Sequence, residues 1–467
     1  MATTGATNKG LASFVRDYVA RTRDFSRNAN LYVLHVIGMD MIHGSWSVLF
    51  NLYLLAIGFD LSFIGLRLAI EYVSRAVMAV PAGLTSDRIG RKASFVLGDG
   101  VGALFGLIMI STRSEFVLLM LPVLGAFFGN LHHTAEPAFM AENSQPRERV
   151  HLFAIAGSLR TFSAMIGALI AALVTMQFVD LLGEVEAYRY ATYAGLALWF
   201  LSLIPAVMLR TYEAVERPED ESETAPVLQR ARTAGNWADV LFARFVSLFS
   251  EIKHPRRIFY FALTSAFLSL GFGVVGPMFN VVFHEGHVEA SDTQVGFMFA
   301  AGELVLAAAT LVTPLLLLRF LRVEAIVLTR LVAIPFVLGM ALWPQVVGEG
   351  QLLVLLVGFS YVGRLAWFRM SSPLDDAFNM DVLDARERAT NTGIEIAVGG
   401  GVSAVAIFAG SRLLDSGDYT TPFLIMAGAY VVSTAIYWRV FRPLDREVTD
   451  AAQASMATAE AGVAGGG

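Results

Sequence analysis

The chain has 467 residues, of which 55% are hydrophobic and 16% are charged, whereas soluble globular proteins carry about 25% charged residues. This composition excludes an ordinary soluble domain and indicates a membrane protein. The formal net charge of −6 gives no reason to expect a nucleic-acid partner, because much of the acid lies in one segment, residues 213–223. The chain contains no cysteine, which excludes disulfides and thiolate metal sites.

The first predicted element is a cytoplasmic amphipathic segment, residues 1–28. It is not a cleavable signal, because the first long apolar run starts after it and many more runs follow. Phe14, Val15, Tyr18 and Val19 recur at helical spacing among arginines. This pattern predicts a short helix that lies on the membrane surface.

Long apolar runs follow in two groups. A helix needs about 20 mostly apolar residues to cross a bilayer. By this criterion the first half, residues 29–211, contains six spans: 29–57, 60–84, 93–112, 116–141, 149–178 and 188–210. The second half, residues 256–442, contains six more: 256–284, 292–318, 324–345, 351–373, 387–413 and 420–441. The segment between them, 212–255, is predicted to be a cytoplasmic linker with an amphipathic helix, and 443–467 a disordered tail.

Lys and Arg residues gather in the loops after spans 2, 4, 8 and 10, and the opposite loops have few. Basic residues in short loops favour the cytoplasmic side of a membrane. We therefore expect both termini and the linker in the cytoplasm, and the chain in the cytoplasmic (inner) membrane with the lipid bilayer around it.

The two halves also repeat each other. Segments 135–150 and 374–389 align without a gap, which places Glu136 over Asp375. The run LFNLYL in span 1 resembles MFNVVF in span 7, so that Asn51 corresponds to Asn280. Two six-helix halves of the same topology are typical of a transporter with a central site where the halves meet.

The stretch GLTSDRIGRK lies between spans 2 and 3. It matches the signature Gly-x-x-x-Asp-Arg-x-Gly-Arg-Arg/Lys of the major facilitator superfamily through Gly83, Asp87, Arg88, Gly90, Arg91 and Lys92. The chain therefore resembles a member of this superfamily over residues 29–442. The resemblance implies an all-α membrane protein with twelve transmembrane helices in two pseudo-symmetric halves. It also implies a secondary active transporter that works by alternating access.

The signature has an expected role as a conformational latch. In the family, the acid at the position of Asp87 faces the amino end of span 11, which here lies near residues 389–391 and carries the positive end of a helix dipole. Arg91 is expected to pair with Glu142 at the inner end of span 4. Gly83 and Gly90 permit close helix approach and a tight turn. A cluster that only fixes membrane topology is the alternative, and it is compatible with a latch.

Charges inside the bilayer are costly and are functional candidates by default. In this family, spans 1, 4, 7 and 10 line the cavity, and spans 2, 5, 8 and 11 flank the seam between the halves. The cavity or seam charges on these spans are Arg67, Glu71, Arg75, Arg160, Glu303, Arg364 and Glu395. The first three stand four residues apart, so an internal salt bridge explains them as well as substrate binding does. Asp99 and Arg330, in spans 3 and 9, are expected to snorkel to the cytoplasm.

Asp40 and Glu136 are the candidates for proton coupling. Asp40 lies in the middle of span 1, and His43 is its one potential cationic neighbour along the helix. A carboxylate removed from water can exchange protons near neutral pH, although a hydrogen-bonded acid at a helix contact is the alternative. Glu136 precedes Pro137 in span 4 and is the reserve candidate.

Other chemistry finds little support in the sequence. His132 and His133 are adjacent, hence about 100° apart on a helix, so we expect no metal site. Without a GxxxxGK[ST] motif, or a nucleophile beside a base, we expect no cofactor and no catalytic residue. The leading hypothesis is a gradient-driven transporter of a small-molecule substrate, with protons as an optional partner. A membrane-embedded enzyme and a transporter-like sensor or scaffold without flux are the alternatives.

Overall fold

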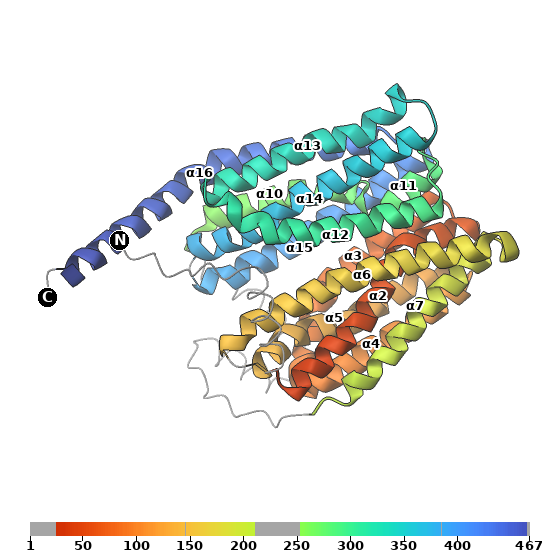
Figure 1. Ribbon diagram of the computed structural model, residues 1–467, viewed down its shortest axis with the longest axis horizontal. Coiled ribbons are helices and arrows are strands. Elements are labelled where there is room, and N and C mark those ends of the chain that lie inside the picture. The colour runs from red at the N-terminus through yellow and green to blue at the C-terminus, as the bar shows by residue number, and fades with distance from the viewer. Residues whose placement is uncertain (1–24, 145, 211–252, 384, 465–467) are drawn as a thin grey trace, which may run out of the picture.

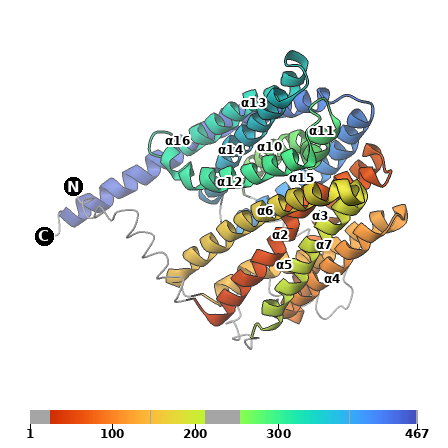
Figure 2. The ribbon, with the colours of Figure 1, turned by 45° about the vertical axis from the view of Figure 1, so that its right-hand side comes forward.

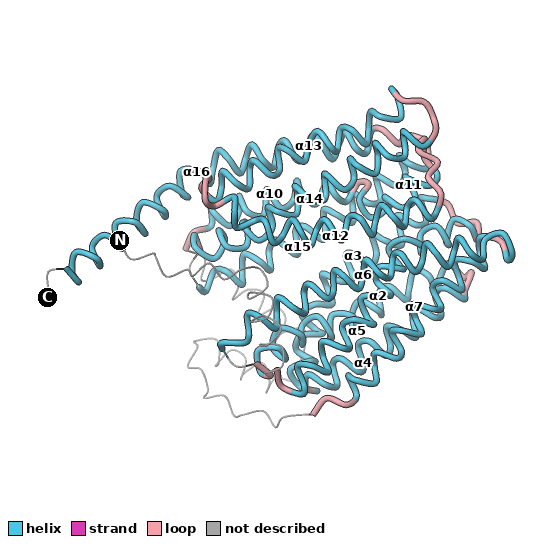
Figure 3. The backbone as a smooth tube through the Cα atoms, viewed as in Figure 1, coloured by secondary structure: helices cyan, strands magenta, loops and turns pink. Residues whose placement is uncertain are grey.

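The computed structural model describes residues 25–144, 146–210, 253–383 and 385–464, and all the regular structure in these ranges is helical (Figures 1 and 3). Most of the predicted N-terminal amphipathic segment and nearly all of the linker, including its amphipathic run, lie outside the described residues. The all-α fold class is confirmed.

Six long helices form the first half, and each coincides with a predicted span to within a few residues. They are α2 (Arg27–Ala56), α3 (Leu61–Ile89), α4 (Arg91–Ser111), α5 (Glu115–Glu142), α6 (Pro146–Leu182) and α7 (Glu184–Val207). Gly90 separates α3 from α4 with φ of 84°, a conformation that glycine adopts without steric cost. The tight turn predicted in the signature is therefore present.

The second half repeats this plan with one interruption. Its helices are α10 (Pro255–Gly273), η1 (Gly276–Met278), α11 (Phe279–Glu285), α12 (Asp292–Leu316), α13 (Arg322–Val346), α14 (Gln351–Val382), α15 (Ala385–Asp415) and α16 (Thr421–Ala464). The predicted span 256–284 is thus broken after Gly273, close to Pro277, which has no N–H to continue a helix.

The last helix is longer than the sequence predicts. Residues 443–464, predicted as part of a disordered tail, continue α16 as a helix that projects beyond the bundle (Figure 1). Alanine has the highest helix propensity, so an alanine-rich segment of low complexity can be helical. Residues 465–467 lie outside the described part.

Ten candidate spans in the described residues are long and apolar enough to cross a membrane, with α10 to α11 counted as one. The chain is therefore a multi-pass membrane protein. Helices α3 and α12 fall outside this set, and α3 carries the charged residues Arg67, Glu71 and Arg75.

Packing within each half follows the same scheme. Helix α2 packs against α6 and α7, and α3 against α5; correspondingly, α10 packs against α15 and α16, and α12 against α14. The halves meet mainly through two pairs, α3 with α15 and α6 with α12, and α2 also contacts α11 and α12. The internal repeat in the sequence therefore corresponds to a pseudo-symmetric pair of bundles.

The two halves are joined at one end and diverge toward the other (Figures 1 and 2). At the joined end, which we call the closed end, the Asn51 side chain of α2 donates to the Pro277 carbonyl at 3.0 Å, and Asn280 of α11 donates to the Val48 carbonyl at 2.8 Å. Gly65 of α3 lies so close to Ser411 of α15 that an added Cβ would be 2.0 Å from its Oγ. The other end carries Gly83–Lys92, and we call it the signature end.

Candidate functional site

Arg160 of α6 lies between two acids from other helices of the first half. Its Nε is 3.3 Å from Asp40 Oδ2 on α2, and its terminal nitrogen donates to Glu136 Oε1 on α5 at 2.5 Å. Both acids are buried, whereas the Arg160 side chain is one-third exposed. We call these three residues the Arg160 triad. The sequence offered only His43, on the same helix, as a cationic neighbour of Asp40; the structure adds Arg160 from another helix.

The two acids hold Arg160 differently. The Glu136 contact is a short hydrogen-bonded ion pair, but Asp40 Oδ2 and Arg160 Nε are both buried without a hydrogen bond in the described structure. His43 Nδ1 lies 3.4 Å from the other oxygen of Asp40. Glu303, on α12 of the second half, lies within electrostatic range of Asp40. With two ionised carboxylates and one guanidinium, the triad has a net charge of minus one, and the uptake of one proton makes it neutral.

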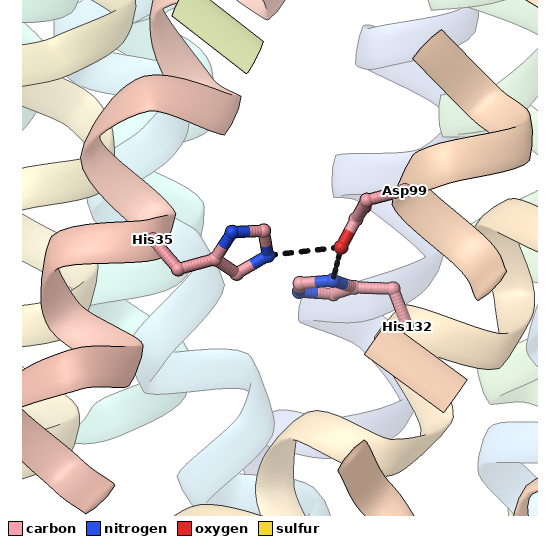
Figure 4. Close-up of side chains that lie close together, drawn as sticks. All are labelled: His35, Asp99 and His132. Atoms are coloured by element: carbon pink, nitrogen blue, oxygen red, sulfur yellow. Dashed lines mark hydrogen bonds and ion pairs between the residues drawn. The ribbon is translucent and has the colours of Figure 1, made fainter. Parts of the chain in front are cut away.

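A second buried network joins His35, Asp99 and His132 in the first half (Figure 4). His35 Nε2 and His132 Nδ1 are 2.9 and 2.7 Å from the same oxygen of Asp99, Oδ2. The other nitrogen of His132 is 3.2 Å from the Tyr32 hydroxyl. Asp99 is only 4% exposed, so the expectation that it snorkels to the cytoplasm is wrong. The polar residues His35 and Asp99 within apolar spans were the available signal for this network.

The second half has its own buried pair. Arg330 of α13 is 1% exposed, and it donates to Asp375 of α14 at 2.8 Å while its guanidinium lies over the Tyr437 ring. The Tyr437 hydroxyl donates to the other Asp375 oxygen at 2.5 Å. Arg330 therefore does not snorkel either, because a carboxylate inside its own half neutralises it.

Arg364 of α14 is a buried cation surrounded by aromatic rings. It donates to the Tyr430 hydroxyl at 2.5 Å, and its guanidinium lies 5.5 and 5.6 Å from the rings of Phe272 and Phe279, on either side of the break between α10 and α11. Among the described residues no carboxylate forms an ion pair with it. Cation–π contacts of this kind stabilise a desolvated guanidinium.

The charges on α3 pair with each other, as the internal salt-bridge alternative predicts. Glu71 contacts Arg67 at 3.1 Å and Arg75 at 2.8 Å. All three line a cavity of about 200 Å³ that lies inside the first half, between α2, α3, α4, α5 and α7. His133 lines the same cavity, and so do Asp99 and His132 of the second network.

Two remaining candidates lie on seam helices of the second half, Glu303 on α12 and Glu395 on α15, and both are half-buried. Glu303 also lies within electrostatic range of Arg369 on α14, a residue that the sequence did not single out. Glu303 is therefore a charge of the second half that interacts with the Arg160 triad across the seam.

The signature residues form a local network. Asp87, whose side chain is two-thirds exposed, pairs with Arg91 at 2.9 Å, and Arg91 also lies 3.5 Å from Glu142, as predicted. The close helix approach predicted at Gly83 is not found, since an added Cβ would lie 3.8 Å from Thr134, an ordinary van der Waals distance. Ala76 of α3 lies beside Gly400 of α15, and Asp87 lies about 16 Å further along α3. The latch between Asp87 and α15 therefore stays a prediction.

A twelve-helix bundle in two pseudo-symmetric halves, with buried charges near the seam, defines the class of membrane transporters. The chain matches the Major Facilitator Superfamily over residues 31–373, and it belongs to this family. It is accordingly a secondary active transporter. No curated protein sequence matches the chain at a significant level.

Solved structures of transporters share the fold. A mutant of the nucleoside transporter NupG has 15% sequence identity and a TM-score of 0.69, over 89% of this chain and all of that one. A structure of proton-dependent oligopeptide transporters has 14% identity and a TM-score of 0.67, over 91% of this chain and all of that one. The xylose transporter XylE from E. coli, in an inward-open conformation, has 13% identity and a TM-score of 0.64, over 88% of this chain and 96% of that one.

Proposed function

We propose that this transporter couples the movement of a small solute to protons, and that Asp40 carries the proton. The observation that carries the proposal is the sharing of Arg160 between Asp40 and Glu136. A protein that moves between two states must change the charge of such a site without leaving an unpaired ion in a low-dielectric interior. The proton-dependent oligopeptide transporters and the xylose–proton symporter among the structural neighbours support this choice.

Geometry favours Asp40 over Glu136 as the proton carrier. Glu136 makes the short, hydrogen-bonded contact with Arg160, whereas Asp40 makes a longer one without a hydrogen bond. The groups that face Asp40 are Arg160, His43 and, across the seam, Glu303. Protonation of Asp40 leaves Arg160 paired with Glu136 alone and makes the triad neutral. The Nε side of Arg160 is then available to a solute.

The positions of the basic loops orient the structure in the membrane. If the basic loops face the cytoplasm, the signature end is the inner end, and both termini lie inside the cell. The halves join at the opposite end, through Asn51 and Asn280 among others. We assign the structure to an inward-open state in the cytoplasmic membrane. The family favours transport over the alternatives of a membrane-embedded enzyme and a sensor or scaffold without flux.

The test uses purified protein in proteoliposomes. A thermal-shift screen of metabolites and drugs first identifies a solute that stabilises the folded protein. Asp40→Asn should then retain exchange of this solute down its own gradient and lose accumulation under an imposed pH gradient. Glu186→Gln is the matched control, because Glu186 pairs with Arg189 away from the triad. Accumulation by Asp40→Asn at the parent level would reject Asp40, and the same assay on Glu136→Gln would test the reserve candidate.

A further inference from the structure

Three side chains from three helices converge in the first half. His35 comes from α2, Asp99 from α4 and His132 from α5, and Figure 4 shows both imidazole rings directed at the carboxylate of Asp99. One ring nitrogen or oxygen from each of the three lies within 4.8 Å of the others. All three residues are at least 95% buried. Two imidazoles and a carboxylate are a ligand set that first-row transition metals use in proteins.

Each imidazole is held in an orientation that metal binding requires. His35 Nδ1 is 2.8 Å from the Ser202 carbonyl oxygen, which can only accept, so Nδ1 carries a proton and a neutral ring has its lone pair on Nε2. That lone pair faces Asp99. His132 Nε2 has the Tyr32 hydroxyl as its partner at 3.2 Å, and its Nδ1 faces Asp99. Metal-binding histidines almost always have such a partner on the second nitrogen.

The network also calls for an additional cation. His35 has an oxygen on both sides, the Ser202 carbonyl and the Asp99 carboxylate. A neutral imidazole has a single N–H and can donate to only one of them. Either an extra proton or a metal ion between His35 and Asp99 satisfies the network.

We propose that His35, Asp99 and His132 bind a divalent transition-metal cation of the Zn²⁺ class, which ties α2 to α4 and α5. The sequence predicts no metal site because it offers only His133 as a partner for His132 on α5. The second imidazole comes instead from α2. The proposed site is independent of the proton carrier, since Asp40 is not among its ligands.

The site can be entered and can take up the ion with a small adjustment. Asp99 and His132 line the cavity of about 200 Å³, which leaves room for water as a fourth ligand. Bond lengths of about 2.1 Å in a tetrahedral site separate ligand atoms by about 3.4 Å. The two ring nitrogens are now 2.9 and 2.7 Å from Asp99 Oδ2. The carboxylate oxygen must therefore withdraw from the two nitrogens by about 0.5 to 0.7 Å on binding.

The test is a titration of tag-free, chelator-stripped protein in detergent with Co²⁺, whose visible absorption reports its coordination. We expect one equivalent to bind with a tetrahedral spectrum, and Zn²⁺ to displace it and to raise the melting temperature. His35→Gln and His132→Gln should lose the spectrum. His133→Gln is the matched control, since His133 is adjacent to His132 and lines the same cavity but is not a ligand. Tyr32→Phe should weaken binding by about 10- to 100-fold.

Two outcomes would overturn the proposal. The first is a wild-type protein that binds no Co²⁺ in a tetrahedral site, which would leave the extra proton as the occupant. The second is folded His35→Gln and His132→Gln protein, judged by circular dichroism and gel filtration, that binds Co²⁺ as tightly as the wild type. The wild-type titration alone shows whether the protein binds the metal, so the proposal can still be tested if a variant fails to fold.

Discussion

The closed end is held by a reciprocal pair of asparagines, and its removal should open the transporter on that side. Asn51 donates to the carbonyl of Pro277 and to Asn280 Oδ1, at 3.0 and 3.3 Å, while Asn280 donates to the carbonyl of Val48 at 2.8 Å. Each asparagine thus reaches a carbonyl three residues before the other one. Both side chains are buried.

The size of the effect follows from the hydrogen bonds that are lost. Asn280→Ala removes two of the three, the one to Val48 and the one from Asn51. Hydrogen bonds between membrane helices contribute about 0.6 kcal/mol each, so this variant should favour opening by about 1.2 kcal/mol, or roughly sevenfold. The double variant with Asn51→Ala loses all three, which corresponds to about 1.8 kcal/mol and roughly a twentyfold change.

Distance measurements between spin labels give the populations directly. The chain has no cysteine, so single cysteines at Glu184 and Ser416, both exposed on different halves at the closed end, can be labelled without other changes. The long-distance fraction should rise in the order wild type, Asn280→Ala, double variant. Ser47→Ala is the control, because its hydroxyl donates to Gly44 within the same helix. Equal distributions in all four proteins would refute the role of the asparagine pair.

Three further changes test other parts of the molecule. Asp87→Asn should enlarge the population open at the signature end by weakening the predicted latch, and an unchanged distance between labels at the signature ends of α3 and α15 would speak against it. Burial raises the pKa of Glu387, but hydrogen bonds from the His254 side chain and from the backbone N–H groups of His254 and Lys253 outweigh this and lower the pKa overall. The contribution of Glu387 to stability is therefore present above its unfolded pKa and is lost as the pH falls through its folded pKa. In a plot of melting temperature against pH, Glu387→Gln should reduce the fall on the acid side. Arg330→Leu leaves Asp375 without its cation and should cost about 3–5 kcal/mol, whereas addition of Asp375→Leu should recover most of the melting temperature; no recovery would contradict the ion pair as the cause.

Features that depend on one helix alone could be predicted from the sequence. Hydrophobic length located the spans, because a bilayer requires about the same run of apolar residues in each. The spacing of Arg67, Glu71 and Arg75 predicts their pairing along α3, and both pairs are present. The internal repeat matched Asn51 with Asn280, and the structure shows that the two contact each other.

Contacts between helices could not be predicted in the same way. In a membrane bundle, apolar residues cover the lipid-facing and the buried sides alike, so periodicity does not tell which face meets which neighbour. Arg160 therefore gave no sign that it reaches both Asp40 and Glu136. His35 and Asp99 gave no sign that they meet His132, because they lie on α2 and α4. The break after Gly273 was missed because an apolar run passes through it without a change in hydropathy.

The distribution of charges suggests why the halves can separate. All ion pairs found among the described residues join groups of the same half, such as Arg160 with Asp40 or Arg330 with Asp375. Contacts across the seam instead use neutral donors, for example Asn51 with Asn280. Breaking a buried ion pair costs about 3–5 kcal/mol, whereas a neutral hydrogen bond between membrane helices costs about 0.6 kcal/mol. Rocking of the halves therefore breaks no ion pair among the described residues. It breaks hydrogen bonds from neutral donors, including those from Ser62 to Asp415 and from Tyr188 to Asp292, whose acceptors are carboxylates.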